Sequence, residues 1–349
     1  TIGRSAFGIA TEGQTNPNDP LLAAIRAFFE TRATSHFLSI FSTCFPEFEF
    51  ILYPLRRITG FLFPSYFKYL MDTSTAIVEA RKSNESLRKS DLLQSMLDAK
   101  VNVKALSSMN ENSLAIDTDM SEDENDDTTV VDERQQTYKK MTVNEVVANT
   151  TLVIEAGYET TSSALGYVMH ILVNHIDVQE KVREEIMQLW KKDGKLDYNT
   201  VSNLPFMDAV INETLRLYPP ITLFISRVAD IDYKYKNITI PKGASVIVPI
   251  YQIHRDETFW HEPEKFDPYR FYGDKKQRIN DLTWQPFGAG PRNCVGMRFA
   301  ICEMKLALAK LLSKYRFEST SRTETGEITV IYKGLLMCPK NVYVKAIRL

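Results

Sequence analysis

The chain is short of cysteine, of long apolar runs and of net charge, and each shortage excludes a class of protein. Its four cysteines lie far apart and include no CxxC pair, which argues against both a disulfide framework and a structural zinc site. A reducing compartment fits this pattern best. No apolar run is long enough to span a bilayer. The formal net charge of -2 gives no field that would draw the chain onto nucleic acid, so we expect no nucleic-acid partner.

What remains is an ordinary globular composition. The 349 residues are 44% hydrophobic and 25% charged, which is enough to bury a substantial core in one large domain or two. The opening TIGRSAFG reads as the end of a structural element running into a loop, and no signal or anchor precedes it. We therefore expect the chain to be a fragment of a longer protein.

Two segments stand apart from the regular pattern. The stretch from His36 to Leu70 holds eight phenylalanines but is broken by prolines, so it favours either a core of short packed helices or a hydrophobic lip at a membrane surface or ligand entrance. Residues 107–136 are acidic and lack periodicity, which predicts a disordered surface insertion. This insertion lacks the glycine and spacing of a calcium loop, and we give it no catalytic role.

Regular periodicity begins at Thr142. The apolar spacing predicts a long buried helix from there through Leu172, then helices from Val178 to about Lys191 and from Leu204 to Leu217, the last ended by two prolines. Short β-rich runs, IDYKYKNITI and ASVIVPI, follow around a PKG turn. A last helix should run from near Cys294 to about Tyr315. The chain is predicted to be mainly helical with minor sheet.

The segment PFGAGPRNCVGMRFA places Cys294 between a glycine-rich loop and the first turn of that last helix. Backbone N–H groups and the dipole at a helix start favour a thiolate there. The glycines at 288, 290 and 296 let a flat ligand approach the backbone closely. The other cysteines, Cys44, Cys302 and Cys338, are expected to be small buried hydrophobic residues.

The order FGAGPRNCVG resembles the haem-binding signature of the cytochrome P450 family, F-x-x-G-x-R-x-C-x-G. Phe287, Gly290, Arg292, Cys294 and Gly296 match it. The resemblance implies haem b, iron protoporphyrin IX, with Cys294 as the axial thiolate ligand of the iron. Arg292 is suited to bind a haem propionate.

A Glu-x-x-Arg pair places acid and base one helical turn apart, and on its own it means little. The chain has three: Glu85 with Arg88, Glu180 with Arg183, and Glu213 with Arg216. Only the third lies in a context, ETLRLYPP, that resembles the family's K helix. The family's P-E-R-F segment adds an arginine, and here FDPYRF supplies Arg270 but has Tyr269 in place of the acid. We expect Glu213, Arg216 and Arg270 to form a structural triad that holds the haem-side core together.

The long helix carries AGYETTS, which resembles the oxygen-activation motif of the family's I helix. Ala156, Gly157, Glu159, Thr160 and Thr161 match it. A threonine hydroxyl in mid-helix usually bonds back to its own helix. Beside a haem, Thr160 with Glu159 as relay acid would deliver protons to dioxygen, at a helix that Gly157 opens. Ala156 and Thr160 share one face, expected to lie over the iron.

The resemblance runs almost the whole chain and is closest to the branch of animal family 3 drug-metabolising enzymes and thromboxane synthase. It implies one haem-thiolate domain over residues 1–349 with the cytochrome P450 fold, lacking that fold's N-terminal anchor, first strands and early helices. We therefore expect the segment alone to fold poorly or to lose haem. Arg227 should bind a propionate beside Arg292, and residues 221–225 and 334–336 should line the substrate pocket. Glu155 stands where this branch usually has an apolar or aromatic residue, and it either faces that pocket or pairs with a neighbouring helix.

The activity that the resemblance implies is insertion of one oxygen atom from O2 into a lipophilic substrate. The resemblance also implies that electrons come from NADPH through NADPH-cytochrome P450 reductase. The chain has no GxGxxG or flavin signature with which to collect them alone. That assignment implies a membrane surface, at the cytosolic face of the endoplasmic reticulum. Two alternatives remain: a haem-thiolate endoperoxide isomerase, against which the Glu159–Thr160 pair counts, and a truncated, non-catalytic haem-binding protein.

Overall fold

The structure is a computed structural model that describes residues 2–9, 18–34, 66–102, 138–333 and 335–349, with single positions at 12, 16, 48, 50, 51 and 54. Most of the aromatic stretch, all of the acidic insertion, Cys44 and Gly334 lie outside the described residues. The chain divides into two compact units. The N-terminal unit comprises residues 1–159 and 290–295, and the C-terminal unit comprises residues 160–289 and 296–349.

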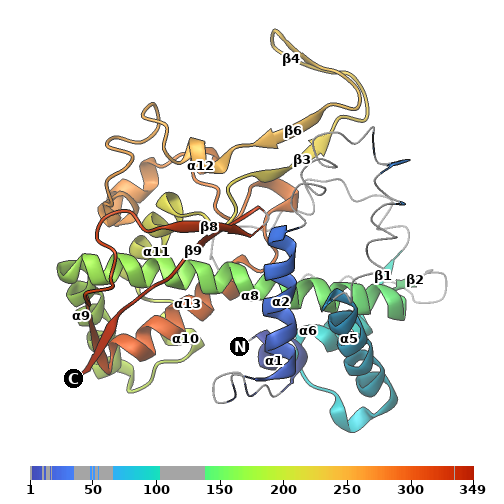
Figure 1. Cartoon of the computed structure of the whole chain (residues 1–349), viewed down its shortest axis with the longest axis horizontal. Coiled ribbons are helices and arrows are strands. Elements are labelled where there is room, and N and C mark those ends of the chain that lie inside the picture. Colours follow the sequence, from blue (N-terminus) through green and yellow to red (C-terminus); the bar gives the residue numbers. More distant parts are fainter. Residues whose placement is uncertain are drawn as a thin grey trace, which may run out of the picture. The chain divides into compact units, whose positions relative to one another are not determined.

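The longest element is helix α8, Val143–Asn174, which belongs to both units (Figure 1). The long helix that the apolar spacing predicts is therefore present. Its start is fixed by a capping box. Thr142 Oγ1 accepts the Glu145 N–H at 3.2 Å, and the Glu145 carboxylate accepts the Thr142 N–H at 2.7 Å, so two orphan donors at the helix start are satisfied.

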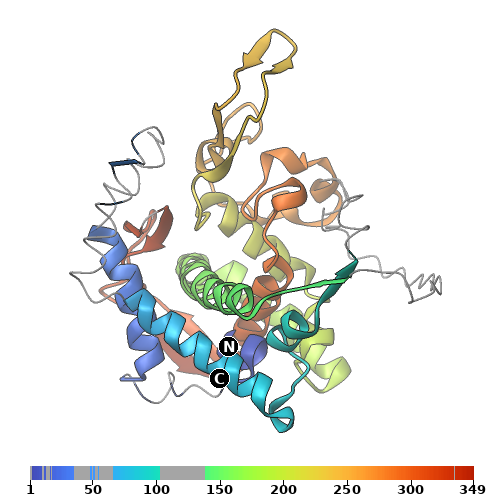
Figure 2. The same cartoon turned by 90° about the vertical axis from the view of Figure 1, so that its right-hand side faces the viewer.

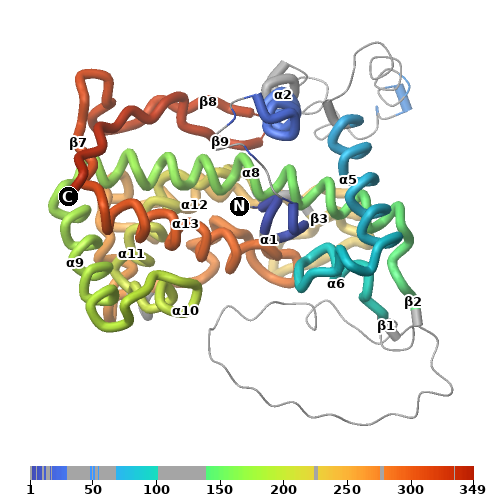
Figure 3. The backbone as a smooth tube through the Cα atoms, turned by 90° about the horizontal axis from the view of Figure 1, so that it is seen from below, coloured from blue at the N-terminus to red at the C-terminus, as the bar shows by residue number. Residues whose placement is uncertain are grey.

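In its described residues, the rest of the N-terminal unit holds helices and one antiparallel strand pair. They are α1 (Ile2–Phe7), α2 (Pro20–Thr34), α5 (Tyr66–Ser83), the 3-10 turn η2 (Glu85–Leu87), α6 (Leu92–Asp98), and the antiparallel strands β1 (Lys100–Asn102) and β2 (Tyr138–Lys140). Helix α2 packs along α5 (Figure 2), and α1 packs against α6 (Figure 3). A buried ion pair between Arg81 and Asp91, at 2.9 Å, joins α5 to the start of α6, and Arg81 also donates to the Phe7 carbonyl.

The C-terminal unit is built on a helical core. The second half of α8 packs with α9 (Ile176–Asp193), α10 (Tyr198–Val201), α11 (Pro205–Leu217) and α13 (Met297–Leu312). Gln179, which is fully buried, bonds this core to the C-terminal sheet. Its amide nitrogen donates to the carbonyls of Leu172 and Phe317 at 2.9 and 3.0 Å, and its amide oxygen accepts the Phe317 N–H at 2.8 Å.

The sheets of the C-terminal unit are small, antiparallel and two-stranded. The pairs are β3 (Phe224–Val228) with β6 (Ser245–Val248), β4 (Tyr233–Tyr235) with β5 (Ile238–Ile240), β7 (Tyr315–Glu318) with β10 (Lys345–Arg348), and β8 (Val330–Lys333) with β9 (Leu336–Pro339). The short helix α12 (Ile250–Ile253) and the 3-10 turns η5 (Pro268–Phe271), η6 (Gly273–Arg278) and η7 (Asp281–Thr283) connect them to the helices.

The described fold is mainly helical with minor sheet, as the sequence predicts. Helix α11 begins with a proline at its first position and ends just before Pro219 and Pro220, which agrees with the stop and start signals of the sequence. A bilayer-spanning helix is not found in the described ranges.

Candidate functional site

The loop before Cys294 is shaped by two glycines in the left-handed region. Gly288, at φ +78°, closes a turn by donating its N–H to the Gln285 carbonyl at 3.0 Å. Gly290, at φ +75°, begins the 3-10 turn η8 (Gly290–Arg292), and its carbonyl accepts the Asn293 N–H at 3.0 Å. Because other residues adopt this backbone only with strain, both positions call for glycine.

Cys294 is half-buried and lies two residues before Gly296, the N-cap of α13. The helix thus begins at Met297, slightly later than a start at the cysteine itself. The reason is local: η8 occupies the preceding residues, and the first helical hydrogen bond runs from the Ala300 N–H to the Gly296 carbonyl at 2.8 Å. Cys294 therefore lies shortly before the helix start, where N–H groups lack partners within the helix.

The other described cysteines have ordinary surroundings. Cys338 is buried in β9, and Cys302 packs against the helical core on α13. Burial raises the pKa of the Cys302 thiol. Cys338 has the burial expected of a small hydrophobic residue, whereas Cys302 is half-buried.

The residues of the AGYETTS segment divide between two faces of α8. Ala156 is exposed, Thr160 is half-buried, and Leu152, one turn before Ala156, is 59% exposed. These three positions are spaced by four, so they follow one open, apolar side of the helix. Glu159 and Thr161 are buried, at 7% and 6% exposure.

Gly157 provides room for a neighbouring helix. A Cβ added there would lie 2.9 Å from Cδ1 of Ile2 on α1, closer than atoms pack. Helix α8 continues without interruption through this position, so the expected opening of the helix at Gly157 is not seen. Glu155, two residues earlier on α8, is also buried.

Glu213, Arg216 and Arg270 lie together in the C-terminal unit. The side chains of Glu213 and Arg216 are 0% exposed, and Arg216 Nε and Nη2 donate to the two Glu213 oxygens at 2.7 and 2.9 Å. Arg270 Nε lies 3.3 Å from Glu213 Oε1, which also accepts the Asp267 N–H at 2.9 Å. Burial raises the pKa of Glu213, while the hydrogen bonds and positive charge of Arg216 oppose that shift. Since each buried charge has a partner, the network is costly to break.

The other two Glu-x-x-Arg pairs lie at the surface. Glu180 and Arg183 are paired at 2.8 Å but are about one third exposed. Arg88 instead donates to Asp98 at 2.7 Å, with both side chains about half exposed. Burial thus distinguishes the third pair from two others with identical spacing.

Tyr269, which replaces the acid of the P-E-R-F pattern, contacts α9. Lys181 Nζ lies 4.6 Å from the Tyr269 ring centre and 4.3 Å from that of Phe206, and it donates to the Tyr269 hydroxyl at 3.1 Å. The position therefore makes a cation–π contact in this chain.

His254 is a buried residue next to the network that sequence reasoning did not select. It is 0% exposed, its Nδ1 lies 3.1 Å from the Arg216 carbonyl, and its Nε2 accepts the Gln285 N–H at 2.9 Å. Burial lowers its pKa to about 3. The HRD sequence after α12 was the only signal that could have indicated it.

The remaining predicted residues are placed as follows. Phe287 is half-buried against the helical core, whereas Arg292 on η8 and Arg227 on β3 are exposed. Two predicted pocket positions meet: Ile221 and Leu336 form an isolated antiparallel bridge.

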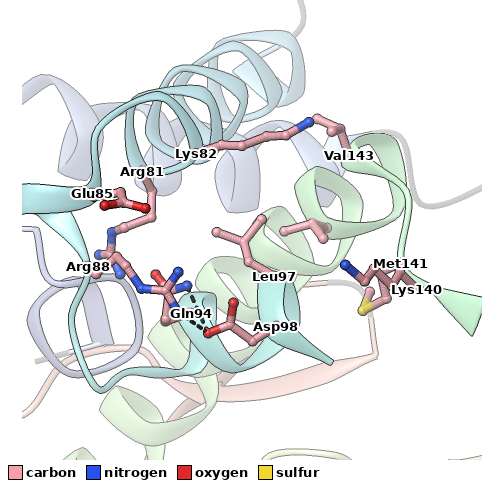
Figure 4. Close-up of a pocket in the computed structure, with 11 residues that line it drawn as sticks. Arg81, Lys82, Glu85, Arg88, Gln94, Leu97, Asp98, Lys140, Met141 and Val143 are labelled. Carbon is pink, nitrogen blue, oxygen red and sulfur yellow. Dashed lines mark hydrogen bonds and ion pairs between the residues drawn. The ribbon is translucent and has the colours of Figure 1, made fainter. Parts of the chain in front are cut away.

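A separate pocket of about 310 Å³ lies in the N-terminal unit (Figure 4). It is lined by residues of α5, η2, α6, β2 and the start of α8, among them Asp98 of α6, and by Arg88, which follows η2. None of the residues predicted for the site lines it.

The comparisons with known proteins agree with these features. The model of the cytochrome P450 family matches residues 1–346. The chain is 34% identical to cytochrome P450 3A6 of Oryctolagus cuniculus and 33% identical to cytochrome P450 3A7 of Homo sapiens, each over 99% of this chain and 62% of that protein. Cytochrome P450 3A29 of Sus scrofa is 33% identical, over 99% of this chain and 61% of its own length.

A cysteine in a glycine-shaped loop shortly before a helix, in a mainly helical fold, fits the haem-thiolate class that the family match indicates. The chain belongs to the cytochrome P450 family. It spans somewhat less than two thirds of the length of the curated relatives it matches.

The residues present fit a haem bound through cysteine. Cys294 and Ala156 belong to the same compact unit. A Cβ added at Gly290 would meet nothing within 4 Å, and the Ala156 side of α8 is open and apolar. A thiolate donor, a bare loop backbone and an apolar helix face suit a large planar group with an iron at its centre.

Proposed function

We propose that this protein is a haem-thiolate monooxygenase, which inserts one oxygen atom from O2 into a lipophilic organic substrate. The observation that supports this most is the position of Cys294, in a glycine-shaped loop directly before α13 and in the same compact unit as Ala156. Haem b bound through Cys294 supplies the redox chemistry that protein side chains lack.

The loop residues have distinct parts in holding the cofactor. Cys294 provides the thiolate ligand, which the adjacent helix start favours electrostatically. Gly290 lets the loop backbone approach the porphyrin, and Phe287 anchors the loop to the helical core. The exposed guanidiniums of Arg292 and Arg227 are suited to the two propionates.

Helix α8 provides the proton path. Thr160 lies on the open side of the helix with Ala156, whose small side chain leaves space for O2. The Thr160 hydroxyl can both accept and donate a proton. Glu159, which is buried next to it in sequence, supplies a carboxyl as relay acid.

The remaining residues position the site and the substrate. Glu213, Arg216 and Arg270 hold the structure around the haem through their buried charge network. The bridge between Ile221 and Leu336 brings apolar side chains from two distant segments together, which suits a lipophilic substrate.

We further propose that the electrons come from NADPH through NADPH-cytochrome P450 reductase, because the chain has no dinucleotide or flavin signature of its own. This partner implies the cytosolic face of the endoplasmic reticulum membrane as the location.

The test is the absorbance difference spectrum of the reduced, carbon-monoxide-bound holoprotein. A red-shifted band reports a cysteine thiolate opposite the ligand, and Cys294→Ser should abolish it. Cys302→Ser, in α13 just after the loop, is the matched control and should leave the band unchanged. A wild-type protein that binds haem without this band would exclude the thiolate assignment.

Turnover then separates the three candidate functions. NADPH-dependent oxidation of a lipophilic substrate with reductase present supports the monooxygenase. Rearrangement of an endoperoxide without NADPH indicates the isomerase, although the Glu159–Thr160 pair speaks against it. A thiolate band without either activity indicates a non-catalytic haem protein.

A further inference from the structure

We propose that His254 is a positioning residue that connects the buried Glu213–Arg216 network to the start of the Cys294 loop. The proposal rests on the proposed function in one respect, because the loop matters only if Cys294 binds haem. His254 itself contacts neither substrate nor cofactor in this scheme.

Both ring nitrogens of His254 have backbone partners. Nε2 lies 2.9 Å from the Gln285 nitrogen, and a backbone N–H can only donate, so Nε2 accepts. The ring proton therefore resides on Nδ1, which donates to the Arg216 carbonyl at 3.1 Å. This is one defined neutral tautomer with both ring nitrogens satisfied, in a side chain with no exposed surface.

One end of this connection is fixed by charge. Arg216 Nη1 donates to the His254 carbonyl at 2.8 Å, so Arg216 and His254 are joined by two hydrogen bonds that run in opposite directions. The same guanidinium donates twice to Glu213. The buried ion pair between Arg216 and Glu213 therefore fixes the position of the His254 imidazole.

The other end is the backbone that leads into the loop. The Gln285 N–H donates to His254, and the Gln285 carbonyl accepts the N–H of Gly288, so both sides of this residue are fixed. The neighbouring Trp284 Nε1 donates to the Asn212 carbonyl of α11 at 3.2 Å. The segment that leads into the glycine loop is therefore fixed by hydrogen bonds. Because Gln285 makes the bonds to His254 and to Gly288 through its backbone, His254 provides the specific side chain of this connection.

Two amide substitutions separate the two ends of the connection. Asparagine places an amide nitrogen near the Nδ1 position and glutamine places an amide oxygen near the Nε2 position. His254→Asn should keep the bond to Arg216 and lose the bond to Gln285. His254→Gln should lose the bond to Arg216 and keep the bond to Gln285, so this variant is the matched control.

Hydrogen exchange provides a readout that needs no haem. Residues 284–288 should exchange about tenfold faster in His254→Asn, the change expected when one hydrogen bond of about 1.4 kcal/mol is lost. In His254→Gln this segment should stay protected. Equal exchange in the two variants would overturn the proposal.

The second readout is the carbon-monoxide difference spectrum of the reduced holoprotein. The thiolate band per bound haem should fall in His254→Asn and largely persist in His254→Gln. Loss of the band in both variants, in proportion to lost folded protein, would mean that His254 is merely structural. Absence of the band in the wild type would refute the proposed function instead, and the exchange measurement would still decide whether His254 fixes the loop entry.

Discussion

Glu213→Ala removes the carboxylate that compensates the charge of a fully buried arginine. The side chains of Glu213 and Arg216 are 0% exposed, and the carboxylate accepts hydrogen bonds from Arg216, from Arg270 and from the Asp267 N–H. Without it, the Arg216 guanidinium keeps its hydrogen bonds to backbone carbonyls and its contact with the Trp260 ring, but has no carboxylate to balance its charge. Removing one partner of a buried ion pair costs about 3–5 kcal/mol, a large part of the roughly 5–15 kcal/mol by which domains are stable.

The chain contains its own control for this prediction. Glu180→Ala removes the acid of a pair with the same spacing and a 2.8 Å contact, but with side chains 30% and 32% exposed. Solvent screens such a pair, and its loss should cost less than about 1 kcal/mol.

Equilibrium urea unfolding of the holoprotein, followed by circular dichroism, measures both effects. Added salt should reduce the Glu180 effect further and leave the Glu213 effect nearly unchanged, because buried charges are poorly screened. Equal losses of unfolding free energy in the two variants would refute the reasoning that burial decides the strength of these pairs.

Three further predictions each concern one side chain. Gln179→Leu should lower the free energy of unfolding by about 3 kcal/mol in urea titrations, since it leaves buried backbone groups of Phe317 unsatisfied; a loss below about 1 kcal/mol contradicts this. Glu185→Ala removes the acceptor of the Phe206 N–H at the start of α11 and should cost about 1–2 kcal/mol, measured in the same way; an unchanged unfolding midpoint contradicts it. The pKa of His254 falls from 6.5 to about 3 on folding, so the unfolded chain binds the proton first as the pH drops. The contribution of His254 is complete above pH 6.5 and should decline by about 2 kcal/mol between about pH 7 and 5; His254→Gln should flatten this part of the stability curve, and equal slopes would refute the assignment.

The helices of the C-terminal unit were predictable because their signals are local. Apolar residues repeat at helical spacing along α8, and the prolines at 219 and 220 end α11 where the pattern predicts. Helix α2 was missed although its signals are present. Pro20 begins it, and Asp19 Oδ1 accepts the Leu22 N–H at 3.0 Å, as an N-cap does.

The candidate site was predictable in its residue types and only partly in its geometry. The glycine and cysteine pattern indicates a loop, but the start of α13 depends on where the first helical hydrogen bond forms, which was set by Gly296. The contacts of His254 bridge 38 positions to Arg216 and 31 positions to Gln285. No local periodicity encodes such bonds, because they arise only when distant segments are packed together.

Tyr269 stands where the P-E-R-F pattern has an acid, yet the buried charge network around Glu213 does not depend on that acid. The carboxylate of Glu213 already has partners in Arg216, Arg270 and the Asp267 N–H, so the network is complete without an acid at position 269. Tyr269 is partly exposed and its ring and hydroxyl contact Lys181 on α9. The physical demand at position 269 is therefore a partner for a cation, which an aromatic ring meets as well as an acid does, whereas Glu213 must satisfy a guanidinium that has no access to water.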